Sequence, residues 1–273
     1  MSARVERVRV DPAGATADAV VDAAALAGTV DGVLFDVDDT LVDTRAAFAA
    51  AIAAASRVWL PHLPADRYDE VLALWRADPD GHYRAYTRGE VDFDAQRMAR
   101  ANELQAAFGG ELLDDATYVD WNAVFWGTFE QSWTAFDDSR PVVDELVAAG
   151  VAVGSLSNAR VELQTRKLAA VGLPDVPLLV GVDTLGFGKP DPRVFAEACR
   201  RLGTDPARTA YVGDELDVDA RAALAAGLVG VWLDRPGTRR GGPHPEDPSA
   251  ARASGVVVVH GLAELPAVLA PTR

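Results

Sequence analysis

The chain has little cysteine, lysine and histidine, and it has no long uninterrupted apolar run. Cys199 is the single cysteine, so an intramolecular disulfide is excluded, and we expect this side chain to be a small buried apolar group. No stretch of about 18 apolar residues occurs, which argues against a membrane-spanning helix. Residues 1–10 alternate charged residues with valine and lack the apolar centre of a secretion signal. We therefore expect a cytoplasmic protein without a membrane partner.

Basic residues are also scarce relative to acidic ones. The chain has 41 Asp and Glu against 26 Lys and Arg, for a formal net charge of -15. Such a surface repels nucleic acid, so we expect no nucleic-acid partner. It also repels anionic metabolites at long range, and a site that binds one must supply positive charge locally. Only two of the basic residues are lysines, Lys167 and Lys189, which suggests that arginine cannot replace them.

The second half of the chain alternates short apolar runs with segments of helical spacing, several of which are closed by glycine. Repeated β-α units of this kind predict a parallel, doubly wound sheet. Residues 234–254 are rich in Pro, Gly and Arg and are predicted to form an exposed loop. The predicted strands are 33–35, 151–156, 178–180, 209–212, 229–233 and 256–259. The predicted helices of this part are 142–149, 160–171, 192–202, 218–226 and 262–269.

Residues 45–135 differ from the rest, because they show helical spacing and no sustained alternation. Five of the six tryptophans lie between residues 59 and 133, which indicates a small core within this segment. Four aromatic residues recur at every fourth position and are predicted to pack in that core: Trp121, Phe125, Phe129 and Trp133.

These patterns predict an α/β protein with two structural parts. The first is a Rossmann-like, doubly wound parallel sheet core, residues 1–44 and 136–273. The second is an inserted all-helical cap domain, residues 45–135. Residues 1–30 precede the first predicted strand, and we expect them to add a strand or helix to the core, with no function assigned. A chain of 273 residues is long enough for this arrangement.

Polar side chains follow four of the predicted strands. Because ligands bind at the carboxyl ends of the strands in an open α/β sheet, we expect these side chains to share one site. The first strand is followed by Asp36, Asp38 and Thr40 in the pattern Asp-x-Asp-x-Thr. The second is followed by Ser157 and Asn158, and the loop after the third contains Lys189 within Gly-Lys-Pro. The fourth is followed by Gly213, Asp214, Asp217 and Asp219.

Asp36, Asp38 and Asp214 bring three carboxylates together at this edge. Carboxylates so close require a cation or a bound proton. Hard oxygen ligands suit Mg²⁺, whereas Zn²⁺ prefers the histidine and cysteine that these strand ends lack. A carboxylate can also act as a nucleophile on phosphorus, and a second acid can protonate the leaving oxygen and then activate water. Asp36 and Asp38 fit these two roles.

A phosphate group at this edge would find hydrogen-bond donors and positive charge. Lys189 supplies a point charge, and the Ser157 hydroxyl supplies a hydrogen bond. The backbone amide of Asn158 lies at the start of the next predicted helix, where amides favour anions. The residues are therefore those of a phosphoryl-transfer site.

Four segments together resemble the motifs of the haloacid dehalogenase-like hydrolase superfamily. The resemblance covers about residues 32–270 and implies a Rossmann-like core with a helical cap between the first and second motifs. The segments that carry it are Phe35 to Asp43, Leu156 to Asn158, Gly188 to Pro192 and Val212 to Asp219.

The resemblance implies roles for the acids of the first motif and for Asp214. Asp36 would be the nucleophile and Asp38 the general acid/base, with Thr40 supporting them in the same motif. Mg²⁺ would be bound by Asp36, the backbone carbonyl of Asp38, and Asp214.

The resemblance also assigns the remaining polar residues. Ser157 and Lys189 would bind phosphate, assisted by the amide of Asn158. Asp219 would orient Lys189 or hold a metal-bound water. Asp217 is the competing candidate for that place, with a solvated acid at the start of a helix as its alternative interpretation.

Two positions bear on the reaction. Dehalogenase members of the superfamily lack the second acid of the first motif, so Asp38 favours phosphate chemistry. Glu215 departs from the small hydroxyl residue that the family often has there. We therefore predict a Mg²⁺-dependent phosphatase acting on a small phosphorylated metabolite, as a monomer or homodimer. The alternatives are a sugar phosphomutase with the same nucleophile, a haloacid dehalogenase, or a non-catalytic interaction protein.

The predicted cap also contains a polar and aromatic cluster. A cap that closes over the site excludes large substrates, so its inner surface is one place to look for specificity. We favour the interpretation that these residues form ordinary helix surface and part of the cap core, because aromatic residues at helical spacing usually pack against one another. The cluster consists of Arg76, His82, Tyr83, Arg84, Tyr86 and Arg88.

Overall fold

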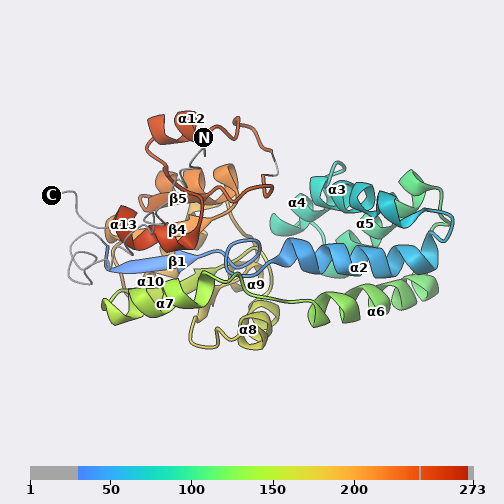
Figure 1. The fold of residues 1–273 in the computed structure, drawn as a ribbon, viewed down its shortest axis with the longest axis horizontal. Helices are drawn as coiled ribbons and strands as arrows, with labels where there is room; N and C mark the ends of the chain where they lie inside the picture. Colours follow the sequence, from blue (N-terminus) through green and yellow to red (C-terminus); the bar gives the residue numbers. More distant parts are fainter. Residues whose placement is uncertain (1–29, 240, 270–273) are drawn as a thin grey trace, which may run out of the picture.

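The computed structural model describes residues 30–239 and 241–269 (Figure 1). The expectation for residues 1–30 therefore lies, apart from Val30, outside the described residues. Within the described ranges no helix is long and apolar enough to cross a membrane.

A parallel sheet forms the centre of the larger lobe. Its strands run in the order β3-β2-β1-β4-β5-β6, so the order reverses between β1 and β4. In such sheets the point of reversal opens a crevice at the carboxyl ends of the strands. The strands are β1 Gly32–Phe35, β2 Ala152–Leu156, β3 Leu178–Val180, β4 Thr209–Gly213, β5 Val229–Leu233 and β6 Val257–Val259.

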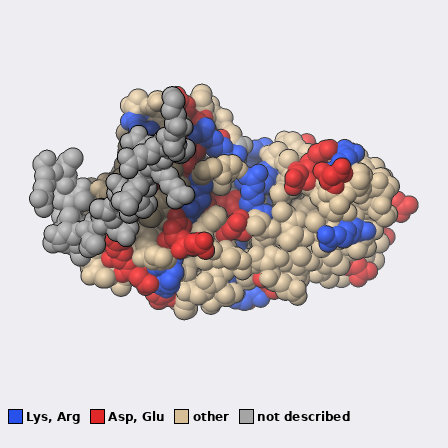
Figure 2. All heavy atoms as spheres, viewed as in Figure 1, with Lys and Arg blue, Asp and Glu red and all other residues tan. Residues whose placement is uncertain are grey.

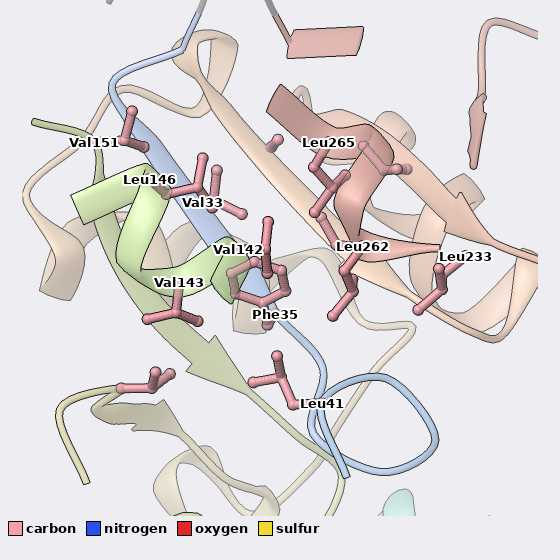
Figure 3. Close-up of a cluster of buried hydrophobic side chains, with 14 of the residues drawn as sticks. Val33, Phe35, Leu41, Val142, Val143, Leu146, Val151, Leu233, Leu262 and Leu265 are labelled. Carbon is pink, nitrogen blue, oxygen red and sulfur yellow. The ribbon is translucent and has the colours of Figure 1, made fainter. Parts of the chain in front are cut away.

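Helices cover both faces of this sheet. Val33 and Phe35 of β1 point to a cluster formed with α7 and α13 (Figure 3), whereas Leu34 points to the opposite cluster with α10 and α11. This alternation is the period of a strand that is buried on both faces. The helices are α7 Ser139–Ala148, α8 Val161–Ala170, α9 Val182–Leu185, α10 Pro192–Leu202, α11 Ala222–Ala225, α12 Pro248–Ala253 and α13 Leu265–Leu269.

Short helical turns of other types complete the larger lobe. A π-helix precedes α11, and 3-10 turns precede β4 and α13. Their bounds are Leu216–Arg221 for the π-helix, and Pro206–Arg208 and Leu262–Glu264 for the 3-10 turns.

A second, helical lobe is inserted between β1 and α7 and extends to one side of the sheet (Figure 1). Aspartates begin three of its helices by accepting a backbone hydrogen bond: Asp43 for α2, Asp92 for α5 and Asp114 for α6. The elements are α2 Thr44–Trp59, a 3-10 turn Ala65–Arg67, α3 Tyr68–Ala77, α4 His82–Thr87, α5 Phe93–Phe108 and α6 Asp115–Gln131.

Aromatic side chains form the core of the helical lobe. Trp121 stacks on Phe125 with ring centroids 4.9 Å apart, and Phe129 meets Trp133 edge to face at 5.7 Å. All four belong to one apolar cluster between α2, α3, α5 and α6. The predicted aromatic core is therefore confirmed, as is the fold class of a Rossmann-like sheet with an inserted helical part. The domain boundaries at residues 45 and 135 stay a prediction.

Two short helices of the larger lobe were not predicted. The loop predicted over residues 234–254 contains α12, whose Ala251 is fully buried. Asp247 caps this helix and Pro248 begins it, but six residues are too few for a periodic signal. The helix α9 was likewise not predicted, because it spans a single turn.

Candidate active site

The ends of β1, β2 and β4 bring the predicted site residues to the crevice of the sheet. The backbone N–H of Asp36 donates to the carbonyl of Val212 at 2.8 Å, which ties the first motif to the end of β4. The Trp232 indole donates to the carbonyl of Asp214 at 3.0 Å and holds the backbone of that residue in place. Asp36 and Asp214 are both buried, so their carboxylates depend on groups within the site.

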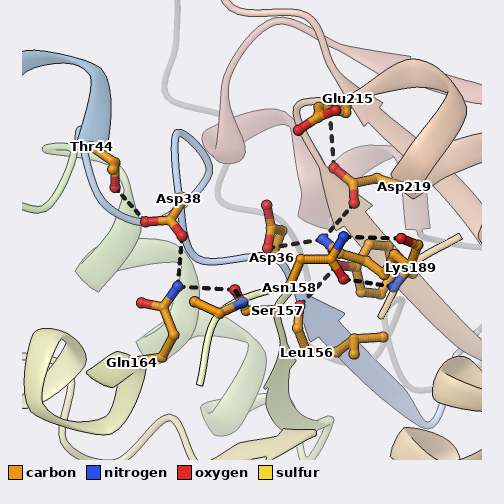
Figure 4. Close-up of polar contacts among 12 residues, drawn as sticks. Asp36, Asp38, Thr44, Leu156, Ser157, Asn158, Gln164, Lys189, Glu215 and Asp219 are labelled. Carbon is orange, nitrogen blue, oxygen red and sulfur yellow. Dashed lines mark hydrogen bonds and ion pairs between the residues drawn. The ribbon is translucent and has the colours of Figure 1, made fainter. Parts of the chain in front are cut away.

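Lys189 lies at the centre of a buried network (Figure 4). Its Nζ is 3.0 Å from Oδ1 of Asp36 and 2.6 Å from Oδ1 of Asp219, and it donates to the Tyr211 hydroxyl at 2.8 Å. The Tyr211 hydroxyl in turn donates to the carbonyl of Leu156 at 2.9 Å. Burial disfavours the charge, but Asp219 and Asp36 hold the pKa of Lys189 well above its ordinary value. Lys189 is therefore a fixed cation beside Asp36.

The structure separates the two candidate acids of the fourth motif. Asp219 is buried, accepts from Lys189 and also accepts the backbone N–H of Glu215 at 3.0 Å. Asp217 instead contacts His244 at 2.6 Å and Arg221 at 3.6 Å. The geometry thus places Asp219 in the site and Asp217 outside it.

Gly213 and Gly188, two glycines of the motifs, leave room for neighbouring side chains to pack against the backbone. A Cβ at Gly213 would lie 2.3 Å from the Asp219 carboxylate, and one at Gly188 would lie 2.2 Å from Oδ1 of Asn158. That Asn158 oxygen accepts the backbone N–H of Lys189 at 2.6 Å, and its amide donates back to the Lys189 carbonyl at 3.0 Å. The Asn158 side chain therefore holds the lysine loop, a contact that the sequence did not predict.

Three carboxylates converge beside this lysine. Oxygens of Asp36, Asp214 and Asp219 lie within 4.8 Å of one another, and all three residues are buried. Burial raises the pKa of Asp36 to about 7, against the lowering effect of Lys189. A buried group of three acids and one lysine lacks positive charge, and hard oxygen donors suit a divalent cation such as Mg²⁺. The donor set therefore fits the expected metal.

Asp38 has a different environment from Asp36. Its carboxylate accepts from the Thr44 hydroxyl at 2.6 Å and from the Gln164 amide at 2.6 Å (Figure 4), and it forms an ion pair with Lys167. Burial opposes ionisation, but Lys167 and these hydrogen bonds lower the pKa of Asp38. Asp36 and Asp38 are thus two neighbouring acids whose surroundings shift their pKa values in opposite directions.

Ser157 and Thr40 take different places. The Ser157 hydroxyl lines the cavity described below and accepts from Gln164 at 2.9 Å and from the N–H of Ala159 at 3.2 Å. Thr40 is buried in the turn after β1, and its carbonyl accepts from Arg235 at 3.4 Å. Ser157 thus faces the cavity, while Thr40 supports the turn.

A cavity of about 150 Å³ lies between the two lobes, and Asp36 forms part of its wall. This is small beside the roughly 300–1,000 Å³ of pockets for drug-sized ligands, so it suits a small metabolite. The larger lobe contributes Asp36, Asp38, Ser157, Asn158, Lys167, Lys189 and Glu215, among others. The helical lobe contributes Phe48, Trp75, Arg76, Tyr83, Tyr86, Phe93, Arg97, Arg100, Trp126 and Phe129, among others.

The polar and aromatic cluster of the predicted cap divides in the structure. Arg76, Tyr83 and Tyr86 line the cavity. Arg84 and Arg88 have largely exposed side chains that pair with Asp78 and Glu90. The interpretation as helix surface therefore holds for Arg84 and Arg88, whereas Arg76, Tyr83 and Tyr86 border the site.

Several residues that line the cavity or contact Asp38 were not among the predicted site residues. Lys167 and Gln164 lie one turn apart on α8, and Arg97 and Arg100 lie one turn apart on α5. None of these four residues comes directly after a strand, so a search for polar residues at strand ends could not identify them. For Lys167 the scarcity of lysine in the chain was an available signal.

On the face shown in Figure 2, acidic and basic side chains are interspersed, and basic ones also lie at the junction of the two lobes.

A family model described as haloacid dehalogenase-like hydrolase matches residues 30–227. The match includes all four segments that carry the site residues.

Individual proteins are similar over shorter or more distant stretches. The phosphoserine phosphatase of Thermus thermophilus is 37% identical over 117 residues, which cover 42% of this chain and 45% of that protein. The glyceraldehyde 3-phosphate phosphatase of Methanothermobacter thermautotrophicus is 27% identical, covering 74% of this chain and 84% of that protein. The chain thus matches less than half the length of the first of these.

Solved structures share the fold. The L-2-haloacid dehalogenase PA0810 superposes with a TM-score of 0.66 at 26% identity, over 88% of this chain and 98% of that one. The likeness extends over both lobes.

Proposed function

The chain belongs to the haloacid dehalogenase-like hydrolase family, and we propose that it is a Mg²⁺-dependent phosphatase of a small phosphorylated metabolite. Asp36 is the nucleophile and forms an aspartyl-phosphate. Asp38 is the general acid/base, and Lys189 and Ser157 bind the phosphate together with the amide of Asn158.

The pair of unlike acids in one cavity carries this proposal. Asp36 is paired with Lys189 and Asp38 with Lys167, and their pKa values are shifted in opposite directions. A nucleophile must be ionised, and a cation bound beside Asp36, Asp214 and Asp219 would favour the ionised form of Asp36 that burial alone disfavours. The assignment therefore rests on the position of Asp36 among these acids and Lys189, with Asp38 held apart from them by Lys167. Asp38 is also the residue that favours phosphate chemistry over dehalogenation. The two phosphatases similar to this chain act on small phosphorylated compounds by their names, which supports the same substrate class.

The reaction has two steps. In the first, an Oδ atom of Asp36 attacks phosphorus, the bond from phosphorus to the leaving oxygen breaks, and that oxygen takes a proton from Asp38. In the second, a water oxygen attacks phosphorus, Asp38 takes the water proton, and the bond from phosphorus to Asp36 breaks. Inorganic phosphate leaves, and both carboxyl groups return to their starting states.

Lys167 and Lys189 serve these steps as fixed charges. Lys167 stabilises the Asp38 carboxylate that exists between the two steps, because an adjacent ammonium favours the ionised form. Lys189 offsets the negative charge that the phosphate brings close to Asp36. Both lysines are buried, so water screens them little.

Asp36, Asp214 and the backbone carbonyl of Asp38 would hold Mg²⁺, and Asp219 would support it from beside Lys189. When bound, the metal neutralises negative charge on the phosphate. The buried acids described above fit that ion.

Phosphate release from a generic aryl phosphate tests the proposal. We expect turnover that requires Mg²⁺ and that Asp36→Asn abolishes, because an amide is a poor nucleophile. Asp217→Asn is the matched control, since Asp217 contacts His244 outside the site, and it should retain activity. Metal binding without turnover on a broad panel of phosphates would contradict the proposal. Isomerised hexose phosphate in place of free phosphate would indicate a phosphomutase.

A further inference from the structure

Arg97 is a buried cation on the wall of the cavity. The residue lies on α5 of the helical lobe and is only 5% exposed. Its guanidinium lies over the rings of Trp126 at 4.5 Å, Phe93 at 4.6 Å and Phe125 at 5.2 Å. Among the described residues, its Nε and Nη1 atoms have no hydrogen-bond partner.

The other cations of the cavity each face an acid. Lys189 pairs with Asp36 and Asp219, and Lys167 with Asp38. Arg76 lies 2.9 Å from Asp39, and Arg100 lies 3.9 Å from Asp78. Within residues 30–239 and 241–269, no ion pair is found for Arg97.

A buried guanidinium without an anionic partner lowers the stability of the folded protein. Burial of a charge disfavours folding unless the charge is paired, and the aromatic faces return only part of that cost. Burial lowers the pKa of Arg97 to about 10, so the side chain remains cationic at neutral pH. Arginine presents a planar fork of donors that matches two oxygens of one carboxylate or phosphate. The missing partner is therefore an anionic oxygen group.

We propose that Arg97 binds a second anionic group of the substrate, distal to the phosphate that Asp36 attacks. The inference rests on the proposed function, because it places the phosphate at the Asp36 end of the cavity. The substrate class is then a small phosphorylated metabolite that carries a carboxylate or a second phosphate. Arg97 is a specificity-determining residue, and the aromatic side chains around it exclude water from the ion pair.

Matched substrate pairs test this assignment in the wild-type protein. Phosphoserine and phosphoethanolamine differ by a carboxylate, and a sugar bisphosphate and its monophosphate differ by a phosphate. We expect kcat/KM to be at least about tenfold higher for the anion-bearing member of one pair, since charged hydrogen bonds contribute at about this level. The pair that discriminates identifies the anion as carboxylate or phosphate.

Variants of Arg97 assign the preference to this side chain. Arg97→Gln should lower kcat/KM for the preferred substrate by about 10- to 100-fold and change that of its partner by less than about threefold. Arg97→Lys should restore part of the loss by keeping the charge. Arg67→Gln is the matched control, because Arg67 lies over the Phe108 ring in the same lobe but is half exposed and paired with Glu70. It should change neither member of the pair.

Two results would overturn the inference while leaving the phosphatase intact. One is a wild-type protein that hydrolyses both members of each pair equally well. The other is a folded Arg97→Gln protein that loses activity equally on both members. If Arg97→Gln does not fold, the wild-type comparison and Arg97→Lys still decide. Absence of phosphate release from every compound would instead refute the proposed function, and this inference with it.

Discussion

At the scale of single residues, Asp38 depends on side chains that lie outside the sequence motifs. Lys167 and Gln164 approach its carboxylate from one face of α8, since residues three apart on a helix are neighbours. Thr44, at the start of α2, approaches it from the helical lobe. The proposed general acid/base is thus oriented by three separate donors.

Replacing Lys167 by Met should lower kcat by at least about tenfold, because Asp38 loses the charge that stabilises its ionised form. Lys167→Arg should not restore activity, since the ammonium is buried between the Phe129 and Trp133 rings at 5.2 and 5.6 Å. Steady-state kinetics on one phosphate ester would measure this. Arg166→Met is the control, because Arg166 is exposed on the same helix and pairs with Glu130. A Lys167→Met protein with nearly wild-type kcat would contradict the role.

Most of the candidate site was predictable at this scale because each motif residue follows a strand. Asp36, Ser157 and Asp214 need only the strand register to meet. Lys167 and Arg97 reach the cavity through the packing of α8 and α5, which the sequence does not encode locally. The pairing of Asn158 with the Lys189 backbone likewise depends on the path of a loop.

At the scale of elements, aromatic packing between α2, α3 and α6 holds the helical lobe together. Trp121 is 1% exposed and contacts Phe125 and Tyr118 on its own helix and Trp75 on α3. Trp121 does not itself line the cavity. Its contribution to stability can therefore be separated from catalysis.

Trp121→Ala should lower the free energy of unfolding by about 3–5 kcal/mol, the usual cost of removing a buried aromatic side chain. Val119→Ala on the same helix is the control, because Val119 is 64% exposed, and its effect should stay within about 0.5 kcal/mol. Denaturant titration of both variants would measure the difference. Equal stability of the two variants would show that the aromatic stack does not support the lobe.

The longer strands and helices of the larger lobe were predictable because their apolar runs are bounded by glycine and polar turns. The helix α10 shows this best: Pro192 begins it and Gly203 ends it in the left-handed conformation. The short helices α9 and α12 escaped prediction, since one or two turns give too few residues for a 3.6-residue period. The π-helix before α11 also shifts the start of the helix predicted over residues 218–226.

At the scale of the whole molecule, contacts between the lobes enclose the cavity. Arg76 of α3 bonds Asp39 in the turn after β1 at 2.9 Å. The Gly188 N–H donates to the carbonyl of Thr87 at 2.9 Å, beside Lys189. The arrangement of an α/β core and a helical insert followed from the sequence pattern. The placement of one lobe over the other rests on individual contacts that the pattern does not specify.

Mg²⁺ should raise the melting temperature of the whole protein, because a ligand that binds only the folded state stabilises it. Sodium at equal ionic strength is the necessary control, since any cation screens a net charge of -15. Asp214→Asn should lose the part of the shift that is specific to Mg²⁺. An equal shift with sodium, or a full shift in Asp214→Asn, would contradict the metal site. Thermal unfolding followed by circular dichroism would measure it.

Trapping of the covalent intermediate tests the central claim most directly. The protein would be mixed with Mg²⁺ and a hydrolysed phosphate ester, quenched in acid during turnover, and digested for mass spectrometry. We predict that the peptide containing Asp36 gains the mass of one phosphoryl group, and that Asp36→Asn abolishes the gain. Steady phosphate release with the label on a different residue, or with no label on any peptide, would contradict it.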